Sequence, residues 1–351
     1  MTIKHKRSYY SMIHHREAPW FPSDDSITDQ LLCDDLYGSM NAYIEENGIK
    51  LLPDEYSITR LSLKEDRSTI QEFIARFYGN DKWKLEIDQS EFEFMDASNN
   101  TQFLGVKWRG LLIAMISIET FNVTYNGVLY KAGYGDHLIV HPKFRSTGLS
   151  NIVITNAIME AARLGCQFDI FTTHAPLNVK SSLVKRLYNL ALTDAPLLSI
   201  DRSLNRYKAL PMKEQTLIEP TLAHVKRFNE MDYKMRFVYT DDQLNAMLKH
   251  EWIYTDGSSV ARFNTIINVA DGIRIKTAVL QDYVNVNSIA FFNEVLTDLR
   301  AKGFDMVTLF NDRTMDTIVN RFGFKKNADM KIYTVNLLPK LKPNEIHVNV
   351  R

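Results

Sequence analysis

The stretch Asp136-His-Leu-Ile-Val-His-Pro-Lys-Phe-Arg-Ser-Thr-Gly-Leu-Ser150 is the part of the sequence around which the chain is organised. Its apolar run at 138–140 is typical of a buried strand and ends before Pro142, which cannot donate to a sheet ladder. Apolar residues then recur at helical spacing as far as Gly165, which suits a helix C-cap, and a second apolar run follows at 168–171. The pattern predicts a strand, a loop, a helix and a strand.

The loop between the first strand and the helix has the composition of an anion site. Arg145 supplies a cation, and Gly148 has no side chain to keep the backbone away from a ligand. The unpaired N–H groups of a helix N-terminus attract phosphate. An ordinary turn with a solvated arginine is the alternative, and the flanking strand and long helix favour the phosphate site. The residues expected to hold the phosphate are Arg145, Ser146, Thr147, Gly148, Leu149 and Ser150.

Composition restricts the class of protein. A chain of 351 residues with 45% hydrophobic residues is long enough for two packed domains. Its 42 basic and 42 acidic residues cancel, which argues against a nucleic-acid partner. Cys33 and Cys166 are distant in sequence, and a buried thiol at Cys166 is expected rather than a disulfide. The basic start is followed by no apolar segment, so we expect a cytoplasmic protein without stable membrane insertion.

Along the rest of the chain, residues 1–53 read as an irregular arm that wraps a domain. Periodicity and turn residues then predict regular elements on both sides of a linker near Pro211. Strands are expected at 56–63, 101–108, 111–121, 128–134, 197–204, 259–268, 273–283 and 304–310, and helices at 68–78, 181–190, 221–229, 241–249, 289–302 and 313–321.

The chain repeats one of its patterns. Ala162-Arg-Leu-Gly-Cys-Gln-Phe-Asp-Ile170 is echoed by Leu299-Arg-Ala-Lys-Gly-Phe-Asp-Met306, and each closes an amphipathic helix and opens a strand. We interpret this as an internal duplication of one αβ domain, with units at 54–212 and 213–351. The second unit has no Arg-x-x-Gly loop, so it is free to hold a second substrate.

The pattern Val140-x-Pro-x-x-Arg-x-x-Gly-x-Ser150 resembles the coenzyme A pyrophosphate loop of the GNAT acyltransferases. Two such units with an arm and one loop resemble the protein N-myristoyltransferase family, and the segments 51–63, 252–254, 302–305 and 341–351 match it locally. The resemblance implies an α+β fold of two tandem GNAT-like domains with mixed sheets flanked by helices.

The resemblance also implies catalytic groups. In the family the terminal α-carboxylate takes a proton from the substrate's N-terminal glycine, which places that base at the main-chain carboxylate of Arg351. The backbone amides of His137 and Leu138 match the pair that binds the thioester oxygen in the transition state. We expect a structural role for the His137 side chain.

Substrate-binding positions follow from the same match. Thr172 falls where a threonine holds the glycine amine, and Thr173 competes with it by one register. Asp136 replaces an asparagine that contacts the amine, and Asn189 lies near the position of a peptide-contacting histidine. These departures concern peptide recognition more than coenzyme A binding.

The predicted function is transfer of a long-chain acyl group, myristoyl above all, from myristoyl-CoA to the N-terminal glycine of client proteins by direct attack. Acyl-CoA is then a co-substrate, and no permanent cofactor, no metal and a monomer are expected. Two alternatives stay open: a short-chain GNAT N-acetyltransferase, and a relative that binds acyl-CoA or peptide without turnover.

Overall fold

The computed structural model describes residues 30–31, 33–46, 52, 54–79, 83–175, 197–211, 216–285, 288–311, 315–338 and 341–347. The expected helix at 181–190 lies outside these ranges. None of the described helices is long and apolar enough to cross a membrane.

The first half of the chain contains a helix in the arm and then a mixed series of strands and helices. Before the series come β1 (Gln30–Leu31) and α2 (Leu36–Glu46). The series is β2 (Tyr56–Leu61), α3 (Arg67–Phe77), β3 (Trp83–Ile87), α4 (Gln89–Ser98), β4 (Thr101–Trp108), β5 (Leu111–Tyr125), β6 (Val128–Val140), the 3-10 turn η1 (Pro142–Phe144), α5 (Leu149–Arg163), β7 (Phe168–Ala175) and β8 (Leu197–Ser203).

The second half repeats this series. It contains α7 (Leu222–Lys226), η3 (Arg227–Glu230), β9 (Met235–Val238), α8 (Asp241–His250), β10 (Trp252–Thr255), β11 (Val260–Ala270), β12 (Ile273–Val284), α9 (Ile289–Ala301), β13 (Met306–Asn311), α10 (Asp316–Phe322) and β14 (Lys325–Val335), followed by β15 (Leu337–Leu338), η4 (Pro343–Glu345) and β16 (Ile346–His347). The order from β3 to β7 returns as the order from β9 to β13, which confirms the predicted duplication.

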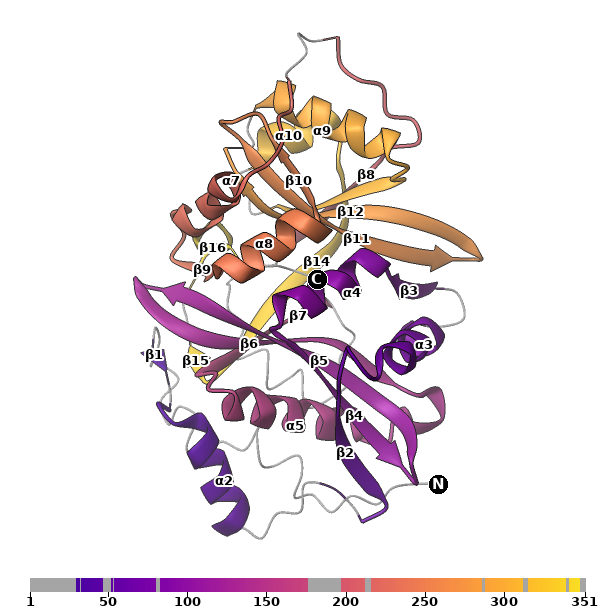
Figure 1. Ribbon diagram of the computed structural model, residues 1–351, viewed down its shortest axis with the longest axis vertical. Coiled ribbons are helices and arrows are strands. Elements are labelled where there is room, and N and C mark those ends of the chain that lie inside the picture. The colour runs from indigo at the N-terminus through magenta and orange to yellow at the C-terminus, as the bar shows by residue number, and fades with distance from the viewer. Residues whose placement is uncertain are drawn as a thin grey trace.

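The two halves are joined into one mixed sheet of 14 strands. Each half places its last strand in the sheet of the other, because β8 pairs with β13 and β14 pairs with β7, while β8 and β14 pair with each other. In Figure 1 the yellow β14 runs from the half that carries α9 and α10 down to the strands of the first half. Two further exchanged pairs, β3 with β11 and β9 with β5, repeat the symmetry.

Helices cover both faces of the first half's sheet (Figure 1). On one face the apolar side of α5 packs on β4 and β5 through Ile152, Val153 and Ala157. On the other face α3 and α4 form a separate apolar cluster with β4, β5 and β6. The strands that carry the loop of 145–150 are therefore held between two helical layers.

The longer elements that were not predicted from the sequence are α2, α4, β9, β10 and β14. The apolar residues of α4 are Phe92, Phe94 and Met95, and this spacing does not follow one helical face. The arm is also less irregular than expected, since α2 packs Leu36 and Met40 against the outer side of α5. Apolar burial orders this part of the arm, as it orders the core.

Candidate functional site

A β-bulge in β6 marks the site. The β5–β6 pairing runs from Met115 opposite Ile139 to Ser117 opposite Asp136, so two residues of β6 lie opposite one of β5. The two residues are His137 and Leu138, and His137 has a φ of 51°. A bulge breaks the hydrogen-bond ladder and turns backbone groups out of the sheet. The oxyanion amides predicted from the sequence thus lie where the backbone leaves regular pairing.

The side chain of His137 is packed into the protein. It is buried, its Nδ1 lies 2.9 Å from the Ser117 hydroxyl, and the rings of Tyr78 and Phe103 pack against it. These contacts lock the ring under the bulge. Histidine is one of the side chains that tolerate a left-handed backbone more readily than most.

The backbone N–H of His137 already has an acceptor. It donates to Oδ1 of Asp136 over 2.7 Å, while Oδ2 of Asp136 is buried without a hydrogen-bond partner among the described residues. A substrate oxyanion can use this amide only if the Asp136 side chain turns away. Burial, with the nearby carboxylate of Asp136, raises the pKa of the Tyr78 hydroxyl in the same wall.

A cavity opens where β6 and β7 separate. The two strands pair in parallel only at 132–134 with 168–170, although β6 continues to Val140. The cavity between them has a volume of about 220 Å³. Its wall contains the bulge residues Asp136, His137 and Leu138, the β7 residues Asp169 to Thr172, and the apolar side chains Ile116, Ile118, Ile154, Ala157 and Ile158.

Thr172 lies in this wall. Thr173 is the next residue of β7 and therefore belongs to the opposite face of the strand. The Thr172 hydroxyl is 3.0 Å from the Tyr134 hydroxyl, a partner that sequence reasoning did not identify. The backbone of Thr173 pairs with Lys331 of β14. Thr172 is thus the threonine of the pair that the structure brings to Asp136 and the bulge.

The loop after β6 leads into α5 as predicted. Gly148 is the N-cap of α5 and has a φ of 85°, a left-handed conformation that glycine adopts without strain. Ser146 also has a positive φ of 62°. The side chain of Leu149 is buried in the core, so only its backbone can face a ligand, and the Thr147 hydroxyl donates to the Phe144 carbonyl over 2.6 Å.

The side chain of Arg145 also makes hydrogen bonds within the protein. Its Nε donates to the Val140 carbonyl over 3.0 Å, and its Nη2 donates to the carbonyls of Phe77 and Gly79 over 3.0 and 3.2 Å. These bonds tie the loop to the end of α3. The side chain is nevertheless exposed, so its positive charge remains at the mouth of the loop.

A second cavity, of about 410 Å³, lies along the loop. It is lined by Arg145, Ser146, Gly148, Leu149 and Ser150 on one side and by the end of α3 and by Trp83 on the other. Tyr78 and Leu138 line both this cavity and the one between β6 and β7. The two cavities therefore meet at the bulge, and an elongated ligand could pass from the loop to the gap between the strands.

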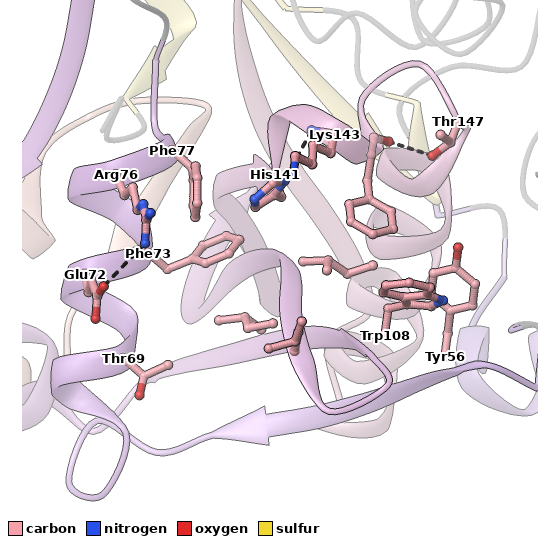
Figure 2. A pocket seen from close by; sticks show the side chains of 14 residues that line it. Tyr56, Thr69, Glu72, Phe73, Arg76, Phe77, Trp108, His141, Lys143 and Thr147 are labelled. Atoms are coloured by element: carbon pink, nitrogen blue, oxygen red, sulfur yellow. Dashed lines mark hydrogen bonds and ion pairs between the residues drawn. The ribbon is translucent and has the colours of Figure 1, made fainter. Parts of the chain in front are cut away.

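The largest of the three cavities, about 700 Å³, was not anticipated from the sequence. Figure 2 shows Phe73 and Phe77 reaching into it from α3, with Trp108 and Tyr56 on the opposite side. The Phe77 and His141 rings are 4.5 Å apart. Burial lowers the pKa of His141, and the charges of Lys143, Arg76 and Arg145 lower it further.

Two predicted site residues, Arg351 and Asn189, lie outside the described residues. The chain is described as far as β16, where Ile346 pairs with Met235 of β9 and His347 lies 2.9 Å from the Asp282 carboxylate. No group of three or more His, Cys, Asp or Glu side chains in the described ranges could hold a metal ion.

Sequence reasoning assigned no role to Asp169, although it lies in the cavity wall. In the sequence it belongs both to the second apolar run and to the repeated pattern of 162–170. A charged residue between two fully buried neighbours, Phe168 and Ile170, is the signal that could have found it.

Comparisons with known proteins bear on the fold. Residues 67–189 match the model of the Acetyltransferase (GNAT) family. A Saccharomyces cerevisiae N-myristoyltransferase structure with bound myristoyl-CoA and inhibitors has a TM-score of 0.67 at 12% identity, covering 93% of this chain and 92% of that one. Another, with bound myristoyl-CoA, has a TM-score of 0.66 at 12% identity and covers 86% of this chain and 90% of that one.

The chain has a tandem GNAT fold. A GCN5-related glucosamine N-acetyltransferase region of a fungal multi-domain enzyme is also similar, with a TM-score of 0.53 at 10% identity over 81% of this chain and 38% of that one. No curated protein sequence matches the chain. At these identities the tandem GNAT fold is what the similarity shows, and it confirms the fold class predicted from the sequence.

Proposed function

We propose that this protein is an acyl-CoA-dependent N-acyltransferase that moves a long-chain acyl group, myristoyl above all, to the N-terminal glycine of a peptide. The observation that carries the proposal is the position of the bulge at His137. It lies where the cavity of the 145–150 loop meets the cavity between β6 and β7. Both cavities belong to a tandem GNAT fold that covers nine-tenths of a myristoyltransferase.

Acyl-CoA would bind with its pyrophosphate at the N-terminus of α5. The backbone N–H groups after Gly148 and the charge of Arg145 suit a phosphate. The adenosine 3′-phosphate end of coenzyme A could lie in the neighbouring large cavity, because Phe77 and Phe144 line both spaces. That cavity offers aromatic rings for a base and Arg76 and Lys143 for a phosphate.

The thioester would then lie at the bulge and the acyl chain between β6 and β7. The glycine amine, held at Thr172, attacks the thioester carbon, and coenzyme A leaves as the thiol or thiolate. The Leu138 amide, with that of His137 once Asp136 turns away, would stabilise the oxyanion. The proton acceptor is the main-chain carboxylate of Arg351. A terminal carboxyl group has a usual pKa of about 3.5 and a terminal amine one of about 8, so this proton transfer is unfavourable by itself. It proceeds because acylation consumes the free amine.

The acyl length and the glycine acceptor rest on similarity to the yeast enzyme structures and on the sequence resemblance. A short-chain transferase is the second candidate, and one observation favours it. The cavity between β6 and β7 has about 220 Å³, less than the roughly 300 Å³ at the lower end of ligand pockets. A long chain would require this cavity to widen. A cytoplasmic location and a monomeric state remain predictions.

A mass-spectrometric assay tests the proposal directly. The purified protein would be incubated with acyl-CoAs of 2 to about 16 carbons, spanning short- and long-chain cofactors, and with peptides that begin with glycine, alanine or acetylated glycine. A mass gain from long acyl groups confined to free glycine is expected. Acetyl transfer alone would assign the short-chain activity, and binding without transfer would contradict both.

The same assay on a chain with one residue added after Arg351 tests the base. We expect turnover to fall at least tenfold while acyl-CoA affinity stays the same, because the terminal carboxylate is displaced. Unchanged turnover would contradict the terminal-carboxylate mechanism and leave Asp136 as the carboxylate at the bulge to examine next.

A further inference from the structure

Asp169 is a carboxylic acid buried in the wall of the cavity between β6 and β7. Its side chain lies on the α5 side of β7, opposite Gly133 of β6, and the residue is only 6% exposed. Its Oδ2 atom is buried and has no hydrogen-bond partner among the described residues. Leaving such a group unsatisfied is costly in a folded protein, so this position calls for an explanation.

The local backbone is shaped to admit the carboxyl group. A Cβ atom on Gly133 would lie 2.2 Å from Oδ1 of Asp169 and 2.8 Å from Cβ of Ala161. Only a glycine at that position leaves room for the acid between β6 and α5. The site is therefore built around the carboxyl group.

The surroundings favour the protonated acid. Burial raises the pKa of Asp169 well above its usual range, and no described cation pairs with it. A protonated carboxyl group offers one O–H donor and one carbonyl acceptor. It would be a hydrogen-bonding group in a wall that also contains the apolar side chains of Ile116, Ile118, Ile154, Ala157 and Ile158.

The other polar groups in the wall lie at the bulge or are paired. His137 contacts Ser117, Thr172 contacts Tyr134, and Asp136 accepts the His137 amide. Asp169 lies opposite Gly133, within the short stretch where β6 and β7 are still paired. With the thioester at the bulge and coenzyme A on the side of the loop, the acyl chain is the part of the donor that reaches Asp169.

We propose that Asp169 makes this cavity select acyl groups that carry a hydrogen-bonding oxygen, such as a hydroxyl or keto group on the chain, over saturated chains of the same length. The inference rests on the proposed acyl transfer and narrows its donor class. An apolar chain would leave the acid unpaired, whereas an oxygenated chain would satisfy it. Sites built to hydrogen-bond a substrate group reject analogues that lack it.

The test compares saturated acyl-CoAs with hydroxy- and keto-acyl-CoAs of equal length whose oxygen lies at successive carbons. For the wild-type protein we expect at least one oxygenated donor to exceed its saturated partner about tenfold in kcat/KM and in affinity. Asp169→Leu should reverse that preference, and Asp169→Asn, which keeps a donor and an acceptor, should retain most of it. Ile158→Val, in the same wall, is the control and should change kcat/KM by the same factor for both donors.

Three results would overturn the inference. The first is equal use of both donors, or preference for the saturated one, at every oxygen position by the wild-type protein, which needs no variant to fold. The second is an equal loss of kcat/KM for both donors in Asp169→Leu, which would mean that Asp169 acts on the coenzyme A part of the donor and not on the acyl chain. The third is no binding of any acyl-CoA, and that result would also end the proposed function, whereas the first two leave it intact.

Discussion

Gly148 sets the backbone conformation of the proposed phosphate loop. Its φ of 85° at the N-cap of α5 lies in the left-handed region, where a Cβ atom is strained. We expect Gly148→Ala to weaken acyl-CoA binding at least tenfold, because a relaxed loop would turn its N–H groups away from the phosphate. Calorimetric titration with coenzyme A measures this affinity.

A matched glycine separates strain from function. Gly272, in the turn between β11 and β12, has a φ of 78° and open space around its missing Cβ. Gly272→Ala should lower the free energy of unfolding by about 1 kcal/mol, as should Gly148→Ala. Gly272→Ala should leave the coenzyme A affinity unchanged. Equal affinities for both variants would show that the loop does not bind through the backbone around Gly148.

At the scale of elements, an ion-pair cluster holds α5 to the sheet. Glu160 of α5 accepts paired hydrogen bonds from Arg60 of β2 at 2.7 and 2.9 Å and from Arg163 at 2.9 and 2.6 Å. Although burial alone would raise it, the arginines lower the pKa of Glu160 to about 2, with the Arg163 hydrogen bond as the largest cause. The carboxylate form is therefore the one that stabilises the fold.

The pH dependence of stability follows from this pKa. A glutamate in an unfolded chain has a pKa of about 4.3, so the stabilisation is complete above that pH and is lost as the pH falls toward 2. Because both arginines are partly exposed, we expect Glu160→Gln to cost only about 1–2 kcal/mol at pH 7. That difference should shrink below pH 4 in urea titrations.

Glu72 provides the control for this measurement. Its carboxylate lies 3.8 Å from Arg76 on the exposed side of α3. Glu72→Gln should leave stability unchanged from pH 2 to pH 7, within error, because exposed ion pairs contribute little. A loss at pH 7 equal to that of Glu160→Gln would mean that net charge, not the cluster on α5, sets the pH dependence.

At the scale of the whole molecule, a buried charge network connects the last described strand, β16, to β11 and β12. Asp282 of β12 lies 2.6 Å from Nε of Arg262 and 2.9 Å from Nε2 of His347, and Arg262 also pairs with Glu251 at 2.8 Å. Burial alone would raise the pKa of Asp282, but Arg262 and the hydrogen bond from His347 lower it. The network holds β16, which the proposed base, Arg351, follows in the sequence.

Removing Asp282 should therefore affect both stability and turnover. Asp282→Ala leaves Arg262 buried with less compensation, and we expect a loss of about 3–5 kcal/mol in the free energy of unfolding. Below the unfolding transition, kcat should fall while acyl-CoA affinity persists, since the loop lies in the other half. The measurements are denaturant titration, steady-state kinetics and calorimetry.

The exposed ion pair of Lys226 and Asp241, whose charged atoms are 3.0 Å apart, provides the control for Asp282→Ala. Asp241→Ala should cost less than about 1 kcal/mol and leave kcat unchanged. If Asp282→Ala were equally mild, the network would not anchor β16. If it lowered acyl-CoA affinity and kcat together, the damage would extend through the exchanged strands to the loop.

Much of the fold could be predicted from local pattern. The strand, loop and helix of 136–164 and each copy of the repeat near Gly165 and Gly303 depend on spacing within one short segment, and the structure confirms both. The helix α4 and the strand β14 were missed because their burial comes from distant elements rather than from their own periodicity. The exchange of β8 and β14 has no signal along the chain, since strand pairing leaves none.

For the site, the sequence by itself determined where a strand, a phosphate loop and a helix could form, because proline, glycine and short apolar runs act through the backbone next to them. Only the tertiary structure decided what surrounds them. It placed the Asp136 carboxylate on the His137 amide, directed Arg145 to the carbonyls of α3, and set Asp169 opposite Gly133. Those contacts depend on how β5, β6, β7 and the helices pack together, which no single segment of the chain specifies.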